Sequence, residues 1–131
     1  MIIIFEDEYF TTLLPLVYMR AVYELRCGAT TLLQKIIRAY PKEKLGLHMR
    51  DYLAATRKKL YAFPINNFPE EDTLFINGRL LAGPKTQIAL SGREEMLLLG
   101  EDEIAAFRVR RENIAKFKPL LNEVLRYMTL E

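Results

Sequence analysis

Five short apolar runs mark the expected strands of this sequence, at residues 2–5, 45–49, 73–76, 96–99 and 104–109. The first, Ile2–Phe5, is β-branched and aromatic with no polar alternation, which is typical of a strand that helices cover on both faces. The third run ends at Asn77-Gly78, where we expect a turn with positive φ. Only four residues, beginning with Gly100, separate the last two runs, and this spacing predicts a β-hairpin.

Helices are expected between these strands. Thr30 is a favourable N-cap, and Pro41 ends a stripe of apolar residues that share one helical face, namely Leu33, Ile36, Ile37 and Tyr40. Asp51 can cap a brief helix through about Lys59, whose basic end suits the negative pole of the helix dipole. The alternation of strand and helix predicts an α/β fold with a mostly parallel sheet and flanking helices.

The clearest amphipathic stripe is the last one, which runs from Ile114 to Met128. Pro119 lies inside it, so we expect either a kink or a short turn at 113–116 followed by a helix that starts with Pro119. The stripe is expected to be core, or to face a missing domain or a second copy of the chain if this is a fragment of a longer protein. Leu130-Glu131 is a dipeptide that cloning sites often leave, so one domain is expected over residues 1–129.

Length and charge narrow the class of protein. A chain of 131 residues, half of them apolar, can bury one core. Its 19 Lys and Arg and 17 Asp and Glu are scattered, and the net charge of +2 offers no case for a nucleic-acid partner. No apolar stretch approaches the ~20 residues that cross a bilayer, and the apolar start ends in acids without a cleavage site. We therefore expect a cytoplasmic protein without a membrane partner.

Several reactive or charged residues are expected to have structural roles. His48 is the only histidine, which leaves no partner histidine for a catalytic dyad. Cys27 is the only cysteine, so we expect it to be packed in the interior. Arg108, Arg110 and Arg111 alternate with apolar residues and are expected on the solvent face of an edge strand.

Ligands of open α/β sheets bind outside the carboxyl ends of the strands. The residues that follow two expected strands, Glu6–Glu8 and Asn77–Arg79, are therefore the first candidates for a site. The long segment before the first helix also carries Arg20 and Arg26, and a guanidinium group is well shaped to bind phosphate. The alternative is that these arginines only form ion pairs with the acids of the same segment, which are Glu6, Asp7, Glu8 and Glu24.

Two sets of short motifs point to a known family. The first is Phe5-Glu6-Asp7, Leu13-Leu14-Pro15-Leu16, Arg20, Glu24-Leu25-Arg26, Gly28, Thr31 and Lys35, and the second is Phe75-Ile76-Asn77-Gly78-Arg79-Leu80-Leu81. They resemble the opening of a GlmU-like family of sugar nucleotidyltransferases, and the resemblance covers most of residues 1–110. In members of that family this region precedes a left-handed β-helix with acyltransferase character.

The resemblance implies a Rossmann-like fold related to the nucleotide-diphospho-sugar transferases, here incomplete, and a reaction that joins a sugar 1-phosphate to a nucleoside triphosphate with release of pyrophosphate. It implies Mg²⁺ as a cofactor. Arg20 and Arg26 would be the catalytic phosphate clamps. The nucleotide-binding residues implied in this way are Phe5, Asp7, Lys35, Asn77 and Gly78.

The sequence also departs from the pattern of the characterised pyrophosphorylases. Glu6-Asp7-Glu8-Tyr9 stands where they have a glycine-rich loop, and Met19-Arg20-Ala21 replaces Thr-Arg-Pro. Asn77-Gly78-Arg79 stands where they commonly carry a metal-binding aspartate, so the metal ligands are not identified. Two alternatives stay open: a non-catalytic module that binds a nucleotide sugar or regulates an attached β-helix acyltransferase, and a plain oligomerisation domain.

Overall fold

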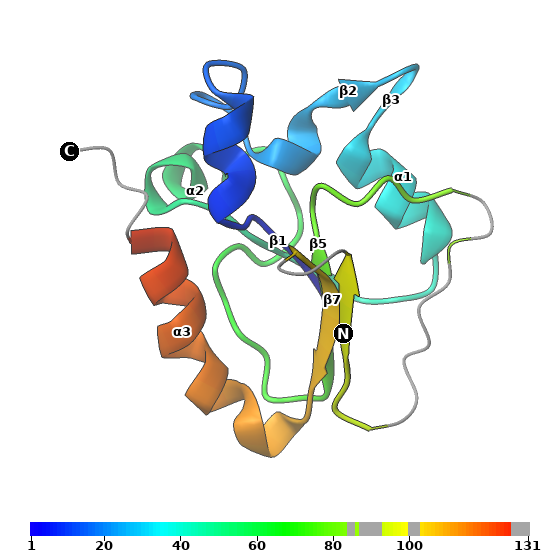
Figure 1. Cartoon of the computed structure of the whole chain (residues 1–131), viewed down its shortest axis with the longest axis vertical. Coiled ribbons are helices and arrows are strands. Elements are labelled where there is room, and N and C mark those ends of the chain that lie inside the picture. The colour runs from blue at the N-terminus through cyan, green and yellow to red at the C-terminus, as the bar shows by residue number, and fades with distance from the viewer. Residues whose placement is uncertain (84–85, 87–92, 100–102, 127–131) are drawn as a thin grey trace.

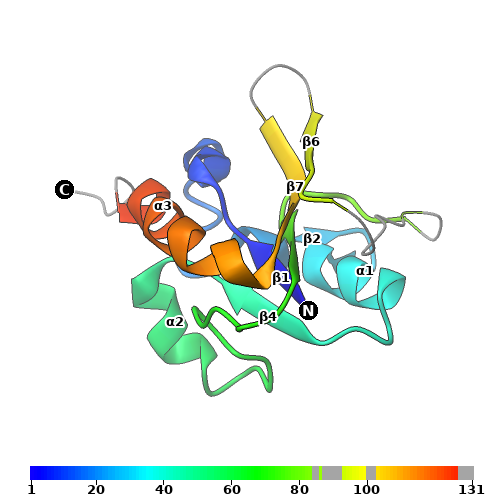
Figure 2. The ribbon, with the colours of Figure 1, turned by 90° about the horizontal axis from the view of Figure 1, so that it is seen from below.

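The computed structural model describes residues 1–83, 86, 93–99 and 103–126. Its centre is a five-stranded sheet in the order β4-β1-β5-β7-β6 (β1, β5 and β7 are labelled in Figure 1, β4 and β6 in Figure 2). The strands are β1 Ile2–Phe5, β4 Leu45–His48, β5 Thr73–Asn77, β6 Met96–Leu99 and β7 Glu103–Val109. β1 is parallel to β4 and β5, whereas β7 is antiparallel to both β5 and β6.

The α/β class is therefore confirmed, but the sheet is mixed rather than mostly parallel. The expected antiparallel pair of β6 and β7 is present, and because it joins the sheet without a crossover helix, it contributes antiparallel pairings. Residue Gly100, which was expected to help form the turn of this hairpin, lies outside the described residues.

The helices are α1 Leu32–Ala39, α2 Asp51–Arg57 and α3 Ile114–Arg126, with 3-10 turns η1 Glu8–Leu13, η2 Val22–Glu24 and η3 Arg111–Asn113. The N-cap of α1 is Thr31 rather than Thr30, because the Thr31 hydroxyl accepts a hydrogen bond from the Gln34 N–H. The expectation of a helix that starts at Pro119 is wrong. Ile114 is buried against the sheet and anchors the first turn of α3 upstream of the proline. None of the described helices has both the length and the apolar character needed to cross a lipid bilayer.

Alternate side chains of β1 belong to two separate cores. Ile2 and Ile4 pack in the cluster that includes the apolar face of α1, whereas Ile3 and Phe5 pack in the cluster that includes the start of α3. Figures 1 and 2 show α1 and α3 on opposite sides of the sheet. The unbroken apolar run at the N-terminus therefore does form a strand that is covered on both faces.

The long segment between β1 and α1 lies beyond the carboxyl ends of β1 and β5 (Figure 1). This crossover contains η1, η2 and a two-stranded antiparallel hairpin, β2 Arg26–Cys27 and β3 Thr30–Thr31. At the hairpin turn Gly28 has a φ of +77°, which favours glycine over residues with a side chain.

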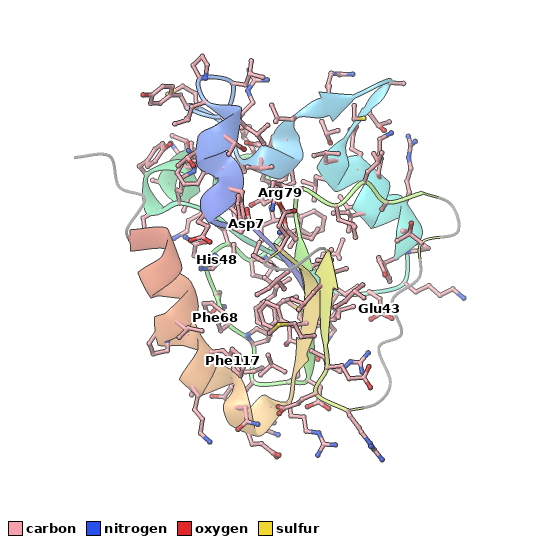
Figure 3. The ribbon with its side chains drawn as sticks, viewed as in Figure 1. Asp7, Glu43, His48, Phe68, Arg79 and Phe117 are labelled. Atoms are coloured by element: carbon pink, nitrogen blue, oxygen red, sulfur yellow. The ribbon has the colours of Figure 1, made fainter. Side chains whose placement is uncertain are left out.

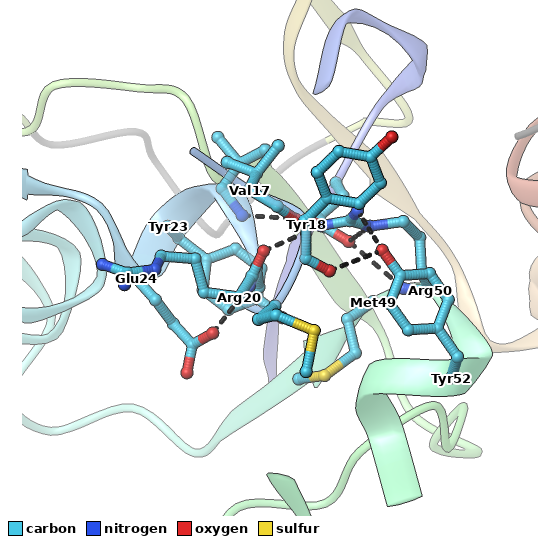
Figure 4. A network of polar contacts seen from close by, with 12 residues as sticks. Val17, Tyr18, Arg20, Tyr23, Glu24, Met49, Arg50 and Tyr52 are labelled. Carbon is cyan, nitrogen blue, oxygen red and sulfur yellow. Dashed lines mark hydrogen bonds and ion pairs between the residues drawn. The ribbon is translucent and has the colours of Figure 1, made fainter. Parts of the chain in front are cut away.

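A buried ion pair fastens the crossover to the sheet. Glu6, directly after β1, accepts hydrogen bonds from the Arg50 Nε and Nη2 at 3.2 and 3.1 Å. It also accepts from the backbone N–H groups of Arg50 and Val22. Arg50 in turn donates to the carbonyl oxygens of Val17 and Arg20 at 2.7 and 2.8 Å (Figure 4). The pair therefore satisfies backbone groups of an irregular segment that would otherwise be buried without partners.

Gly78 is needed for space rather than for a special backbone conformation. Its φ is not positive, so the expected turn with positive φ is wrong. A Cβ on Gly78 would lie 2.4 Å from Cδ1 of Tyr23. The Tyr23 ring is fully buried and its hydroxyl donates to the His48 carbonyl at 3.2 Å, which keeps the ring from moving aside.

The structure corrects two expectations about individual residues. Cys27 is exposed rather than packed inside, because the β2–β3 hairpin carries it away from the cores. β7 is not an edge strand, since β6 pairs with its outer side, and Arg108 is accordingly buried while Arg110 and Arg111 beyond the strand are exposed. His48 is buried in β4, in agreement with a structural role.

Replacing Glu6 by Gln is expected to lower the free energy of unfolding by about 3–5 kcal/mol, because the buried Arg50 charge loses its partner. Urea denaturation would measure the loss. Glu112→Gln, an exposed acid at the opposite end of the sheet, is the matched control and should change stability by less than about 0.5 kcal/mol. Equal effects of the two substitutions would contradict the role given to the pair.

Gly78→Ala should destabilise the protein by about 1–3 kcal/mol, because the new methyl group overlaps the fixed Tyr23 ring. Gly46→Ala in β4 is the control. Its Cβ would lie 3.0 Å from the terminal methyl of Met1, which can swing away. Thermal unfolding of both variants checks the expectation, and a Gly78→Ala protein as stable as Gly46→Ala would refute the steric argument.

Candidate functional site

Asp7, Asn77 and Arg79 form a polar cluster at the carboxyl ends of β1 and β5, and Figure 3 shows Asp7 and Arg79 facing each other there. The Asp7 carboxylate accepts hydrogen bonds from Arg79 at 2.7 and 3.0 Å and from the Asn77 amide at 2.7 Å. It also accepts from the Tyr9 N–H at 3.2 Å, which caps η1. Asn77 further donates to the Ile104 carbonyl, so the cluster ties β1, β5 and β7 together.

The charge of Arg79 is enclosed by acids and one aromatic ring. Its Nη2 lies 3.6 Å from the Glu103 carboxylate, and its guanidinium carbon lies 4.9 Å from the centre of the Tyr9 ring. The hydrogen bond with Asp7 raises the pKa of Arg79 above its ordinary value, against the opposing effect of burial. Arg79 is thus a fixed cation that positions Asp7.

A cavity of about 170 Å³ opens beside this cluster, and its walls come from β1, η1, β6, β7 and α3. The lining residues are Phe5, Glu6, Asp7, Glu8, Tyr9, Met96, Ile104, Phe107, Phe117 and Leu120. Most of the lining residues are aromatic or aliphatic, and the acidic ones are the consecutive Glu6, Asp7 and Glu8, of which Glu6 has a fully buried side chain. The cavity lies at the edge of the sheet where α/β folds bind ligands.

The expected nucleotide-binding residues divide into those at the cavity and those away from it. Phe5 and Asp7 line the cavity. Asn77 is bonded to Asp7, and the Gly78 N–H donates to the Phe5 carbonyl at 2.8 Å, so both lie next to the lining residues. Lys35, on α1, does not line this cavity, and its ammonium group donates to the Thr30 hydroxyl at 2.9 Å. Nucleotide binding by these residues stays a prediction.

Arg20 and Arg26 have exposed side chains on the crossover, and neither lines the cavity. Arg26 donates to the carbonyl of Ala29 at 3.0 Å. Three acids proposed as their partners are bound by other arginines, in the pairs Glu6–Arg50, Asp7–Arg79 and Glu24–Arg57. Within the described residues, the ion-pair alternative therefore does not account for Arg20 and Arg26, and their role as phosphate clamps stays a prediction.

The described residues do not form a ready magnesium site. They contain no group of three or more His, Cys, Asp or Glu side chains placed to hold a metal ion. Asp7, the expected candidate, already accepts hydrogen bonds on both oxygens from Tyr9, Asn77 and Arg79. A cation could coordinate Asp7 only by displacing these donors.

Sequence reasoning overlooked Arg50 and gave Arg79 no role of its own. A signal for both was present, since each lies two residues after the last residue of a strand that flanks β1. In a parallel sheet such residues come close to those that follow β1, which are Glu6 and Asp7. The observed pairs are Arg50 with Glu6 on the β4 side and Arg79 with Asp7 on the β5 side.

Comparison with known proteins identifies the family to which this arrangement belongs. Searches of curated proteins and of solved structures gave no match. The model of one protein family, described as sugar nucleotidyl transferase, matches residues 2–128 and so spans the sheet, the crossover and α3. The chain therefore belongs to the sugar nucleotidyl transferase family.

Proposed function

We propose that this chain is the nucleotide-binding domain of an enzyme that joins a sugar 1-phosphate to a nucleoside triphosphate. The observation that carries the proposal is the cavity beside Asp7, at the carboxyl edge of β1, in a chain of the sugar nucleotidyl transferase family. The proposal includes a GlmU-like order of domains, in which a β-helix follows this region, and it leaves the base of the triphosphate open. The chemistry below does not need the β-helix.

In the proposed reaction an oxygen of the sugar 1-phosphate attacks the α-phosphorus of the triphosphate. A new P–O bond forms in line with the bond to the β-phosphate, which breaks, and pyrophosphate leaves with the bonding electron pair. The protein itself has little covalent chemistry to perform in this step. Its contribution is to hold both phosphates in line and to place positive charge beside the oxygens where negative charge develops.

Arg20 and Arg26 are the proposed source of that charge. Both belong to the crossover beyond the carboxyl ends of β1 and β5, and both are exposed. Arg50, Arg57 and Arg79 are engaged by carboxylates and are less suited to the task. An exposed guanidinium group can bind two phosphate oxygens at once without first breaking a buried ion pair.

Nucleotide binding is expected to stabilise the protein and to depend on these two arginines. A triphosphate at 100 times its dissociation constant should add about 2.7 kcal/mol to the free energy of unfolding. Thermal shift measurements with and without Mg²⁺ should show this gain, and Arg20→Ala and Arg26→Ala should each reduce it.

The matched control for this experiment is Arg111→Ala. Arg111 is exposed and follows β7, whose antiparallel direction places it at the opposite edge of the sheet. It should leave the ligand-induced shift unchanged. An equal loss of the shift in all three variants would indicate a general charge effect and would argue against specific clamps.

If the chain is catalytic, it should release pyrophosphate from a nucleoside triphosphate, and it should do so only when a sugar 1-phosphate is present. An enzyme-coupled pyrophosphate assay with a panel of sugar 1-phosphates measures it. Arg20→Ala and Arg26→Ala should each slow the reaction by about 100-fold or more, the usual loss when a charge-stabilising donor is removed. Nucleotide binding without pyrophosphate release for any sugar phosphate would contradict catalysis by this chain and support a non-catalytic binding module.

A further inference from the structure

We infer that the cavity beside β1 binds the base of the nucleotide and that Glu8 selects guanine, an inference that rests on the proposed function and adds the base specificity.

The walls of the cavity suit a flat aromatic group. Phe5, Phe107 and Phe117 contribute aromatic rings, with Phe107 stacked 6.0 Å from Phe117. At about 170 Å³ the cavity is larger than an enclosed one of ~150 Å³ that admits a benzene ring, and too small for a whole nucleotide. Because it opens at the surface, a bicyclic base need not lie completely inside it. A base could therefore enter while its ribose and phosphates stay outside the cavity.

Of the three acids among the lining residues, Glu6 and Asp7 have no acceptor capacity left, and the side chain of Glu6 is fully buried. Glu6 accepts two hydrogen bonds on each oxygen, from Val22 and Arg50 on one and from Arg50 alone on the other. Asp7 likewise accepts two on each oxygen, from Tyr9, Asn77 and Arg79. An ionised carboxylate offers about four such positions, so neither group can receive a donor from a ligand.

Glu8 is different. It is the first residue of η1, it is exposed, and its carboxylate accepts no hydrogen bond from the other described residues although it lines the same cavity. A carboxylate group can only accept hydrogen bonds. A ligand that fills the cavity and satisfies Glu8 must therefore present N–H donors on the edge of its ring system.

Among the common bases, guanine matches this requirement best. Its ring N–H and exocyclic amino group lie side by side and can donate two parallel hydrogen bonds to one carboxylate, the geometry that makes such pairs strong. Uracil and thymine have a single N–H between two carbonyl oxygens, which a carboxylate repels. Adenine and cytosine place their amino group next to a ring nitrogen that is itself an acceptor.

The test is calorimetric binding of GTP, UTP, ATP and CTP to the full chain and to Glu8→Gln. The expected result is preferential binding of GTP, with a loss of about tenfold or more in Glu8→Gln, since a hydrogen bond to a charged group is replaced by one to a neutral amide. UTP should bind more tightly to Glu8→Gln, because an amide can accept from the uracil N–H and donate to its carbonyl oxygen. This reversal would not follow from a purely structural role of Glu8.

Glu112→Gln is the control, since it removes an exposed acid at the other edge of the sheet and should alter no affinity. Preference for a base other than guanine, or unchanged affinities in Glu8→Gln, would overturn the inference. The pyrophosphate assay separates this outcome from failure of the proposed function: turnover with a base preference that ignores Glu8 refutes only the inference, and guanine-selective binding without turnover refutes only catalysis.

Discussion

The buried ion pair between Glu6 and Arg50 is the interaction on which the carboxyl edge of this sheet depends. A long crossover with little regular structure covers that edge, and its carbonyl groups need partners once water is excluded. Arg50 provides them with the flat, five-donor guanidinium group that lysine lacks, while the ring of Phe10 lies 4.3 Å from its central carbon. The pair is therefore less a source of net stability than a means of holding one arrangement of the loop.

The charged side chains at this edge are of two kinds: some form ion pairs that hold the fold together, and others are exposed and can contact a ligand. Glu6 and Asp7, the two residues after β1, each form an ion pair with an arginine that follows a neighbouring strand: Arg50 after β4 and Arg79 after β5. Their charges are cancelled where an anionic nucleotide would otherwise be repelled. The exposed Arg20, Arg26 and Glu8 remain available to a ligand, and this division underlies both the proposed reaction and the proposed base specificity.

Secondary structure was largely predictable from the sequence because it depends on near neighbours in the chain. The strands at residues 2–5, 45–48 and 73–77, the antiparallel pair of β6 and β7, and helices α1 and α2 all appear within a few residues of their expected positions, and α3 follows the predicted apolar stripe but begins before Pro119. The errors arose where tertiary packing decides. β6 covers β7 and so buries Arg108, while the hairpin of the crossover leaves Cys27 exposed.

The sequence by itself determined the α/β class, the segments that carry the candidate site and the resemblance to sugar nucleotidyltransferases, because the apolar period, the succession of strands and helices along the chain, and short motifs can be read from the sequence alone. Only the tertiary structure decided which charged side chains form ion pairs with each other. Several arginines could have paired with the acids of the crossover. Arg50 and Arg79 do so because they follow the two strands that flank β1, and Arg57 does so because α2 lies against the crossover. The need for glycine at position 78 likewise depends on Tyr23, which leaves no room for a side chain there. Tyr23 is 55 positions away in the sequence, and only the fold brings the two residues together.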